Sequence, residues 1–406
     1  MADDLRMGLE ELLRKAALDS GADFLRDGVR VLTQALLEAE VSQHVGAERH
    51  ERTPARTGQR NGYRERTWDT RVGTIDLSVP RVRDGSFYPS MLEPRKRAER
   101  ALVAVVQEAY IQGVSTRRVD DLVQQLGMTG ISKSQVSRLC QALDGEVERF
   151  RSRRLEGVYP YVWLDATFVK ARVGGRVVSQ AIVIAIGATA EGQREILGLD
   201  VGASEDGAFW LQFLRGLVAR GLGGVQLVIS DAHEGLKAAI AAVLTGASWQ
   251  RCRVHFVRNA LALVPKREAA FMASSIRLAF GQLDAASTQA QWRRVADTFR
   301  PRYQRLAELM DEAEADVLAY LPFPHEHWHQ IWSNNPLERL NKEVKRRTDV
   351  VGIFPNPAAV LRLVGMVLAE QHDEWQVCRR YLPASSMAKL LNPEEAPETL
   401  ALMAAG

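Results

Sequence analysis

The sequence predicts an α/β protein with a mixed central sheet, which is interrupted by an all-helical insertion and preceded by helical and small β elements. Short apolar runs bounded by turn residues are concentrated between residues 156 and 256, which is typical of buried strands. Long segments with helical periodicity lie on both sides of this region. With 406 residues, of which 46% are hydrophobic and 25% charged, the chain is long enough for two or three domains of ordinary folded composition.

The composition argues against a membrane or secreted protein. No window approaches the roughly 18 consecutive apolar residues of a membrane span, and the acidic N-terminus lacks the basic start and apolar core of a secretion signal. The three cysteines, Cys140, Cys252 and Cys378, are far apart and odd in number, which argues against a disulfide framework and for a reducing compartment. We therefore expect a cytoplasmic protein.

Residues 1–48 are expected to be helical. Leucines at helical spacing predict two amphipathic helices between residues 4 and 45. The first carries Leu9, Leu12 and Leu13, and the second carries Leu32, Leu36 and Leu37. Such helices could form a small bundle or a dimer surface.

Residues 49–97 are strongly basic, with eleven arginines and one lysine against six acids, a net charge of 12 − 6 = +6. Turn residues punctuate this stretch, and residues 74–79 alternate like a strand with one buried face, so a basic β-hairpin is expected. A charged face is often only solvated, but a cluster of this kind favours a polyanion partner. The candidate DNA-binding residues here are Arg60, Arg64 and Arg66.

Residues 98–155 predict a helix-turn-helix. Thr116 can cap a first helix that Gly127 ends, and Ser132 can cap a second helix whose apolar face runs from Val136 to Phe150. Two short helices joined by a glycine-containing turn are typical of DNA-binding domains, although an ordinary helical hairpin has the same pattern. The outer face of the second helix carries the candidate DNA-contacting residues Lys133, Ser134, Gln135, Ser137 and Arg138.

From residue 156 to 256 the pattern changes to strands. Three strands are predicted over 161–164, 177–186 and 196–201. A helix over 206–220 follows, then a strand over 225–229 and a fifth short strand over 249–254. A ribonuclease H-like mixed sheet has this order of elements: three strands in succession, then a helix, then a fully buried strand. Residues 156–256 are therefore expected to form the first part of such a core.

Two aspartates directly follow apolar strands in this core. Asp165 ends the first predicted strand, and Asp231 comes after the fourth. A carboxylate at the end of a buried strand is costly unless it meets a cation, and hard oxygen ligands suit Mg²⁺. Two ions roughly 3.5–4 Å apart can clamp the attacking and leaving oxygens of a phosphoryl transfer. Each aspartate alone could instead cap a turn, but the pair favours a metal site.

Glu338 has two interpretations. With Asn335 as N-cap and a proline in the first helical position, Glu338 falls at the third position of a capping box. Asn341, Lys342 and Lys345 lie three, four and seven residues further on and share its face of the helix. An acid followed by these side chains could instead meet a metal ion at one end and DNA phosphate at the other.

The spacing of the acids predicts an insertion. Asp165 and Asp231 are 66 residues apart, whereas 107 residues separate Asp231 from Glu338, which is more than one strand and a connecting helix require. Helical periodicity over residues 257–320 accounts for the excess. The core is expected to resume over 321–385, with Glu338 on a helix, and to leave 386–406 as a C-terminal tail.

Five segments of the chain carry a resemblance to a known family: RNGYRERTWDTRVGTIDLSVPR, YPYVWLDATFVKAR, VISDAHEGLKAAI, RCRVHFVRNAL and WSNNPLERLNKEVKRRTDVVGIFPN. They resemble the Mutator-type transposases of bacterial insertion sequences over nearly the whole chain. The resemblance implies a ribonuclease H-like core of the Asp-Asp-Glu type, in which Asp165, Asp231 and Glu338 match the family's acids. Lys345 matches a basic residue that the family often has seven positions after the glutamate.

Cys252 and His255 match a further signature of this family, a Cys or Asp followed two residues later by His. A structural zinc site would need two more ligands, for which His325, His327 and His329 are the candidates. The alternative is a buried cysteine and a satisfied histidine beside the active site, with His255 close to bound phosphate or flanking DNA. If the segment is extended, the two side chains point to opposite faces.

The resemblance implies a DNA transposase that binds the terminal inverted repeats of an insertion sequence and cuts and joins DNA with two Mg²⁺ or Mn²⁺ ions. Its partners would be double-stranded DNA, as repeat ends and as target, and at least a second copy of the chain, because two ends are handled together. A nucleoid-associated location in a bacterium follows. Two alternatives remain: a nuclease with the same metal core that joins no strands, and a regulator that only occupies the repeats.

Overall fold

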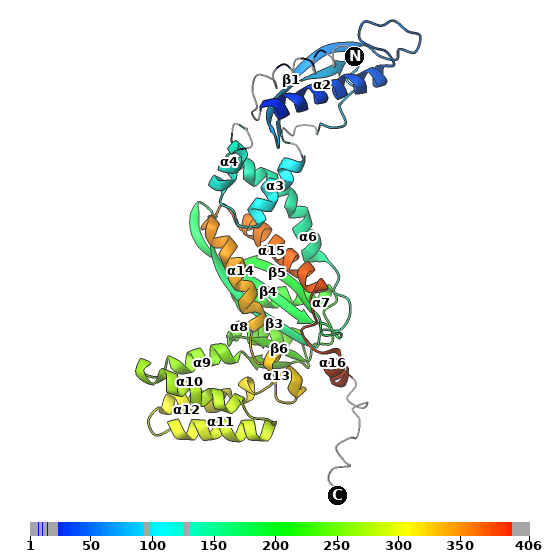
Figure 1. Ribbon diagram of the computed structural model, residues 1–406. Coiled ribbons are helices and arrows are strands. Elements are labelled where there is room, and N and C mark those ends of the chain that lie inside the picture. Colours follow the sequence, from blue (N-terminus) through cyan, green and yellow to red (C-terminus); the bar gives the residue numbers. More distant parts are fainter. Residues whose placement is uncertain are drawn as a thin grey trace. The chain divides into compact units, whose positions relative to one another are not determined.

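The computed structural model describes residues 23–92, 98, 100–125, 128 and 130–391, together with the isolated positions 7, 10 and 14. Contacts divide the chain into two compact units, Met1–Ala142 and Leu143–Gly406. The elements of both units are labelled in Figure 1. Within the described residues, no helix is long and apolar enough to cross a membrane.

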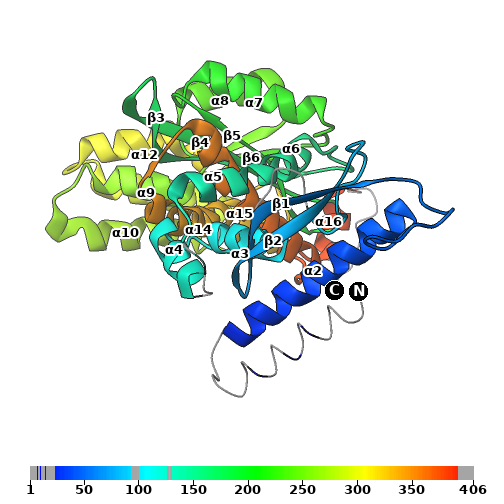
Figure 2. The same cartoon turned by 90° about the horizontal axis from the view of Figure 1, so that it is seen from above.

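The first unit contains the predicted basic β-hairpin. Strands β1 (Arg60–Thr70) and β2 (Gly73–Val82) pair antiparallel, and helix α2 (Asp23–Val45) packs on β2 (Figure 2). The side-chain amide of Gln34 bonds both the backbone N–H and the carbonyl of Ser78, which fixes the helix on the strand. The small core beneath the helix consists of Leu37, Trp68, Ile75, Leu77, Val79 and Leu92.

The leucine pattern of the N-terminal helices is only partly reflected in the structure. Leu37 is buried against the hairpin, whereas Leu32 and Leu36 are exposed. Their exposure follows from the helical period, because one side of α2 covers β2 and the opposite side does not face the hairpin. The expected helix carrying Leu9, Leu12 and Leu13 lies outside the described residues.

Three short helices complete the first unit: α3 (Arg100–Ile111), α4 (Thr116–Gln125) and α5 (Lys133–Cys140). Ser132 caps α5 in a full capping box with Gln135, as predicted. At the start of α4 it is Ser115, not Thr116, whose hydroxyl accepts a hydrogen bond from the N–H of Arg118. The predicted end of this helix at Gly127 lies outside the described residues.

The long second helix expected over residues 133–150 is broken. A 3₁₀ turn, η1 (Gln141–Leu143), separates α5 from α6 (Asp144–Ser152), and the boundary along the chain between the two compact units, after Ala142, falls within this turn. Helix α6 packs on α15 (Pro357–Val377), to which a two-pronged ion pair between Arg362 and Asp144 joins it. These contacts place α6 in the second unit, whereas the sequence grouped it with the helix-turn-helix over 98–155.

The second unit is built on a six-stranded mixed sheet, which confirms the predicted α/β class with a mixed sheet. Strand order is β5-β4-β3-β6-β7, and the short β8 pairs with β3 beyond β6. The β3–β4 and β4–β5 pairs are antiparallel, whereas β6 and β8 run parallel to β3 and β7 runs parallel to β6. The strands are β3 (Tyr161–Val173), β4 (Arg176–Ala188), β5 (Arg194–Gly202), β6 (Leu227–Ser230), β7 (Ser248–Arg251) and β8 (Ile353–Phe354).

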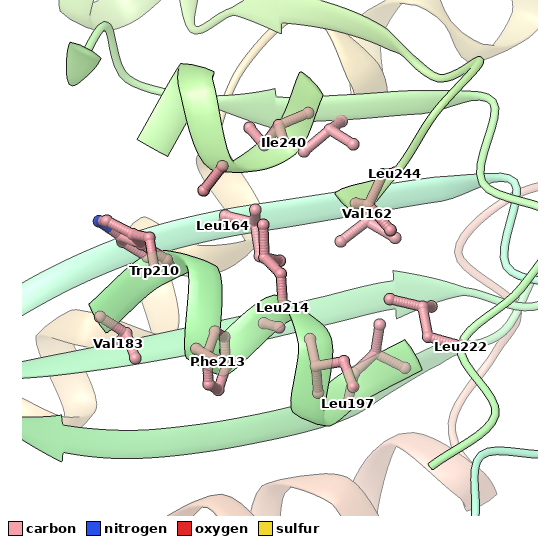
Figure 3. Close-up of a cluster of buried hydrophobic side chains, with 14 of the residues drawn as sticks. Val162, Leu164, Val183, Leu197, Trp210, Phe213, Leu214, Leu222, Ile240 and Leu244 are labelled. Carbon is pink, nitrogen blue, oxygen red and sulfur yellow. The ribbon is translucent and has the colours of Figure 1, made fainter. Parts of the chain in front are cut away.

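Helices cover both faces of this sheet. On one face, α7 (Gly207–Ala219) and α8 (Glu234–Val243) bury the main apolar core, in which Val162 and Leu164 of β3 meet Trp210 and Leu214 of α7 (Figure 3). Side chains alternate along a strand, so the intervening residues of β3 point to the other face. There the sheet meets α15 and α14 (Asn335–Val351).

The predicted helical insertion lies between β7 and α14. It consists of α9 (Arg253–Leu261), α10 (Lys266–Phe280), α11 (Ala285–Phe299) and α12 (Gln304–Val317). Buried Trp292 anchors it, and its indole donates to the carbonyl of Met310. The insertion begins four residues earlier than expected because β7 ends at Arg251. It is followed by η2 (His325–His327) and α13 (Trp328–Ile331), while α16 (Ala384–Leu391) closes the described chain.

Candidate active site

The two predicted aspartates occupy matched positions on neighbouring parallel strands. Pairing between β3 and β6 ends at Trp163 and Ile229, and Asp165 and Asp231 each lie two residues further on. Neighbouring strands are about 4.8 Å apart, so the carboxylates meet at the point where β6 stops. Both side chains are partly buried.

Glu338 lies in the first turn of α14, but the expected capping box does not form. The helix begins at Asn335 with Asn334 as N-cap, and no side chain caps it. Glu338 is therefore the fourth helical residue, whose backbone N–H already bonds the carbonyl of Asn334. The capping interpretation of this carboxylate is wrong, because the helix starts one residue earlier than the sequence suggested.

Asn341 connects this helix to the first aspartate. Its side-chain amide donates to Oδ2 of Asp165 at 2.7 Å, which holds α14 against β3. Lys342 and Lys345 are exposed on the same helix. Glu343 forms ion pairs with Arg346 and Arg347 on its own helix and is not part of the group around Asp165.

Electrostatics single out Asp165. Burial, together with the negative charges of Asp231, Glu205 and Glu338, raises the pKa of its carboxyl to about 7. Three further carboxylates therefore lie close enough to Asp165 to act on its charge. Like charges at close range are stable together only when protons or cations compensate them.

Glu205 was not predicted from the sequence. It lies in the loop between β5 and α7, where the buried indole of Trp210 donates to its Oε1 at 3.3 Å. Burial raises the pKa of this glutamate, and Asp231 contributes in the same direction. The only sign of Glu205 in the sequence is that an acidic residue follows shortly after the third predicted strand.

The helix after this loop and the helix after Asp231 start close together. Gly207 and Gly235 allow the starts of α7 and α8 to touch, because a Cβ on Gly235 would lie 2.7 Å from the backbone nitrogen of Gly207.

A set of buried hydrogen bonds, which we call the Cys252–Asn334 staple, joins the three acid-bearing segments. The N–H of Cys252 donates to the carbonyl of Ser230, the residue before Asp231. The N–H of Asn334 donates to Sγ of Cys252 at 3.3 Å. The side-chain amide of Asn334 then donates to the carbonyl of Leu164, the residue before Asp165, at 3.0 Å. Two fully buried side chains therefore set the spacing of the acids.

Cys252 and His255 do not lie in an extended segment. Cys252 is the N-cap of α9 and His255 lies in its first turn, so the opposite-face argument does not apply. Burial raises the pKa of the Cys252 thiol. Nδ1 of His255 is buried without a hydrogen-bond partner among the described residues, so this histidine is not satisfied in the way that was expected.

The histidines proposed as further zinc ligands are engaged elsewhere. His327 is fully buried between the hydroxyl groups of Tyr161 and Ser386, at 2.7 and 2.8 Å. The rings of His325 and His329 pack on Trp328 and Trp332. The described part of the chain contains no group of three His, Cys, Asp or Glu side chains placed to hold one metal ion.

The oxygen atoms near Asp165 nevertheless suit a divalent cation. Oδ1 of Asn341 and Oδ1 of Asn334 are buried acceptors without a donor in the described chain, and Asn341 bonds Asp165 directly. Mg²⁺ usually takes only one or two carboxylates and completes its shell with water and substrate phosphate. Such sites do not require three protein ligands around one ion, so the donor set fits the group that the sequence implies.

The predicted DNA-contacting residues of the first unit differ in their availability. Arg60 is committed to an ion pair with Glu38 and a hydrogen bond to Ser42. Arg66 bonds the hydroxyl of Tyr88, whereas Arg64 is exposed. On α5, four of the five predicted residues are exposed and Ser137 is partly buried. Gln135 also serves the capping box, so its amide oxygen is already used.

Comparison with known proteins assigns the family. The profile described as "Transposase, Mutator family" matches residues 2–378. The chain belongs to the Mutator family of transposases. This Mutator-family chain is 51% identical over 375 residues to "Transposase for insertion sequence element IS1081" of Mycobacterium tuberculosis, with 92% of this chain and 90% of that protein covered.

Two further relatives of this Mutator-family chain have lower sequence identity but also match most of its length. "Transposase for insertion sequence element ISRM5" of Rhizobium meliloti is 41% identical, covering 91% of this chain and 92% of that protein. "Transposase for insertion sequence element IS256 in transposon Tn4001" of Staphylococcus aureus is also 41% identical, covering 84% and 88%. A chain in a simian T-cell lymphotropic virus intasome matches 52% of this chain and 65% of its own length, but a TM-score of 0.19 at 8% identity carries no argument.

Proposed function

We propose that this transposase cleaves and joins DNA through an Asp-Asp-Glu site formed by Asp165, Asp231 and Glu338, here called the acidic trio. The observation that carries the proposal is the matched position of the two aspartates, with Asp165 within β3 and Asp231 directly after the parallel strand β6. The strand order β5-β4-β3-β6-β7, with α7 before β6, is that of a ribonuclease H-like core, which we propose for the second unit.

The acidic trio would hold two Mg²⁺ or Mn²⁺ ions. When bound, such ions activate a water or hydroxyl nucleophile and stabilise the leaving oxygen of an in-line displacement. Asn341 orients the carboxylate of Asp165 through its hydrogen bond, and the Cys252–Asn334 staple fixes the backbone before both aspartates. Lys342 and Lys345, exposed on the helix of Glu338, would contact the phosphates that flank the cut.

The two chemical steps use the same carboxylates with different nucleophiles. Water would first cut the DNA at the end of the element, and the freed 3′-hydroxyl would then attack a phosphate of the target DNA. Each step breaks one phosphoester P–O bond as it forms a new one, so no covalent link to the protein is required. Because two ends must be joined to one target, we expect at least a dimer on DNA.

The first unit would recognise the terminal inverted repeats. Its basic hairpin would supply phosphate contacts, and the exposed side chains of α5 would read bases in the major groove. Arg64, Lys133 and Arg138 are the exposed cations that best fit this role. Arg60 fits it less well, because Glu38 already neutralises it.

The proposal is tested with labelled DNA that carries an element end, incubated with Mg²⁺ and the full chain. Alanine variants of each member of the acidic trio are expected to lose cleavage and joining by at least 100-fold. Asp349→Ala, which removes an exposed carboxylate from the same helix as Glu338, is the matched control and should act like the wild type. Wild-type activity of any trio variant removes that residue from the site.

A nuclease is the second candidate, because hydrolysis and strand transfer differ only in the nucleophile. Presenting a pre-cut end with a free 3′-hydroxyl separates the two. Joined product supports a transposase, and cleavage without joined product supports the nuclease. Sequence-specific binding without either reaction would support a regulator.

A further inference from the structure

The hairpin formed by β3 and β4 extends past the acidic trio. Strand β6 ends at Ser230, one residue before the level of Asp165, but β3 continues for eight residues beyond Asp165 to Val173 and β4 returns alongside it. Beyond Asp165, the edge of β3 that faced β6 pairs again only at Lys170 and Ala171, with β8. We call residues 166–181 the β3–β4 arm.

The β3–β4 arm carries positive charge without compensation. Lys170, Arg172 and Arg176 are exposed, and no acid occurs in the sequence between Asp165 and Glu191. None of the three cations forms an ion pair with a residue that the structure describes. Ordinary solvated surfaces mix both signs of charge, so a protruding element with cations alone favours a polyanion.

Large apolar side chains are exposed on the same arm. Phe168 is 50% exposed, and Val173 and Val177 are 45% and 43% exposed. Alternation places Phe168, Lys170 and Arg172 on one face of β3, opposite to the face of Asp165. An exposed aromatic ring next to cations is the combination with which proteins stack on bases while contacting phosphates.

The turn at the tip of the β3–β4 arm can come close to another molecular surface. Gly174 and Gly175 form its tip, both with positive φ, of 56° and 79°. Two consecutive positive φ values match the twist of a tight hairpin and favour glycine. The tip has no bulky side chain, so Arg172 and Arg176 can reach a surface beside it.

We infer that the β3–β4 arm binds the DNA duplex that flanks the scissile phosphate, with its cations on the phosphates and Phe168 against a base or sugar. The inference rests on the proposed function. Phe168, Lys170 and Arg172 point to the face opposite to Asp165, and Arg176 pairs with Val173 at the tip of the arm, eight residues of β3 beyond Asp165. The arm therefore holds flanking DNA and does not touch the reacting atoms. It therefore acts on affinity and not on the chemical step.

The test compares Lys170→Ala/Arg172→Ala/Arg176→Ala with a control that removes three exposed arginines elsewhere in the second unit, Arg215→Ala/Arg379→Ala/Arg380→Ala. Affinity for a 40-base-pair element end is measured by fluorescence anisotropy between 50 and 200 mM salt, with EDTA present. Each phosphate contact adds about 0.9 to the salt slope. The arm variant should lose about 2.7 from the slope and bind about tenfold or more weakly at 100 mM, and the control should match the wild type.

Phe168→Ala distinguishes stacking from charge. It should weaken binding without changing the salt slope, and it should raise KM for the element end while kcat stays within twofold. A triple-cation variant that retains the wild-type slope, or that loses no more affinity than the arginine control, overturns the inference even if cleavage proceeds. Failure of the wild type to bind or cut any element DNA would instead overturn the proposed function. A thermal unfolding curve for each variant excludes misfolding as the cause.

Discussion

The high pKa of Asp165 makes the acidic trio a source of instability when no metal is present, and Asp165→Asn should relieve it. Asparagine keeps the size of the side chain, and its amide oxygen can still accept the hydrogen bond from Asn341. It removes the charge that burial and Asp231 disfavour. We therefore expect a variant that is catalytically inactive but more stable than the wild type in metal-free buffer above neutral pH.

The magnitude follows from the shift in pKa, from an ordinary value of 3.8 to about 7 in the folded chain. A group whose folded pKa is raised contributes stability below its unfolded pKa and loses that contribution as pH rises through the folded pKa. Three pKa units at 1.36 kcal/mol each correspond to at most about 4 kcal/mol at pH 8. Near pH 4 the wild type and the variant should be equally stable.

Urea unfolding in EDTA, followed by tryptophan fluorescence, provides the assay. The buried Trp163 and Trp210 report on the second unit, which contains the acidic trio. At pH 8 the variant should have the higher midpoint, and the difference should shrink as pH falls from 8 to 4. Added Mg²⁺ should stabilise the wild type and leave the variant nearly unchanged, since binding to the folded state alone raises stability.

Asp349→Asn is the control, because it neutralises an exposed carboxylate on α14 and should change stability by no more than about 0.5 kcal/mol. The reasoning fails if Asp165→Asn is the less stable protein at pH 8 without metal. It also fails if the difference between the two proteins is the same at every pH, because a burial or packing effect would not titrate.

Three other predictions concern residues around the site. Cys252→Ala leaves the buried N–H of Asn334 without an acceptor and should cost about 1–3 kcal/mol by urea unfolding. Cys252→Ser should recover part of this loss of stability. If the alanine and serine variants lose the same stability, the hydrogen bond assigned to the Cys252–Asn334 staple is contradicted. Glu205→Gln should weaken Mn²⁺ affinity in a calorimetric titration, whereas Glu312→Gln, an exposed glutamate on α12, should not; equal affinities would exclude Glu205 from the site. Burial lowers the pKa of His327 to about 4, so its contribution to stability is present above its unfolded pKa of about 6.5 and is lost as pH falls toward 4. His327→Gln should remove the contribution of one histidine from the pH dependence of the free energy of unfolding between pH 4 and 6.5, and His372, whose pKa has the same shift, contributes separately. An unchanged pH dependence would refute the assignment.

Local patterns predicted those parts of the fold that depend on local physics. Apolar runs with turn residues at their ends identified the five main strands, and Asp165 and Asp231 were found because each directly follows such a run. The Ser132 cap was found for the same reason, since its partner lies three residues away. The mixed sheet then followed from the order of strands and helices.

Contacts between distant residues explain what the sequence did not predict. Asn334 seemed to be an ordinary residue before a helix, yet its side chain is bonded to a carbonyl 170 positions earlier. The same contact places the start of α14 one residue before the expected position. Helix α6 was assigned to the wrong neighbours because Arg362, its ion-pair partner, lies 218 positions further along the chain. A local sequence pattern cannot reveal contacts between residues that lie so far apart in the chain.

The contact between His327 and α16 has a consequence for damaged copies of the gene. Ser386 lies in the last described helix, and its hydroxyl bonds Nε2 of a histidine that also contacts Tyr161 of the central strand. A stop codon a few residues before Ser386 would remove less than a tenth of the coding sequence and leave all the acids of the site intact. It would also remove a hydrogen-bond partner from a fully buried ring. We expect such truncated copies to produce unstable protein, so an intact acidic trio alone is not a sufficient criterion for counting a genomic copy as active.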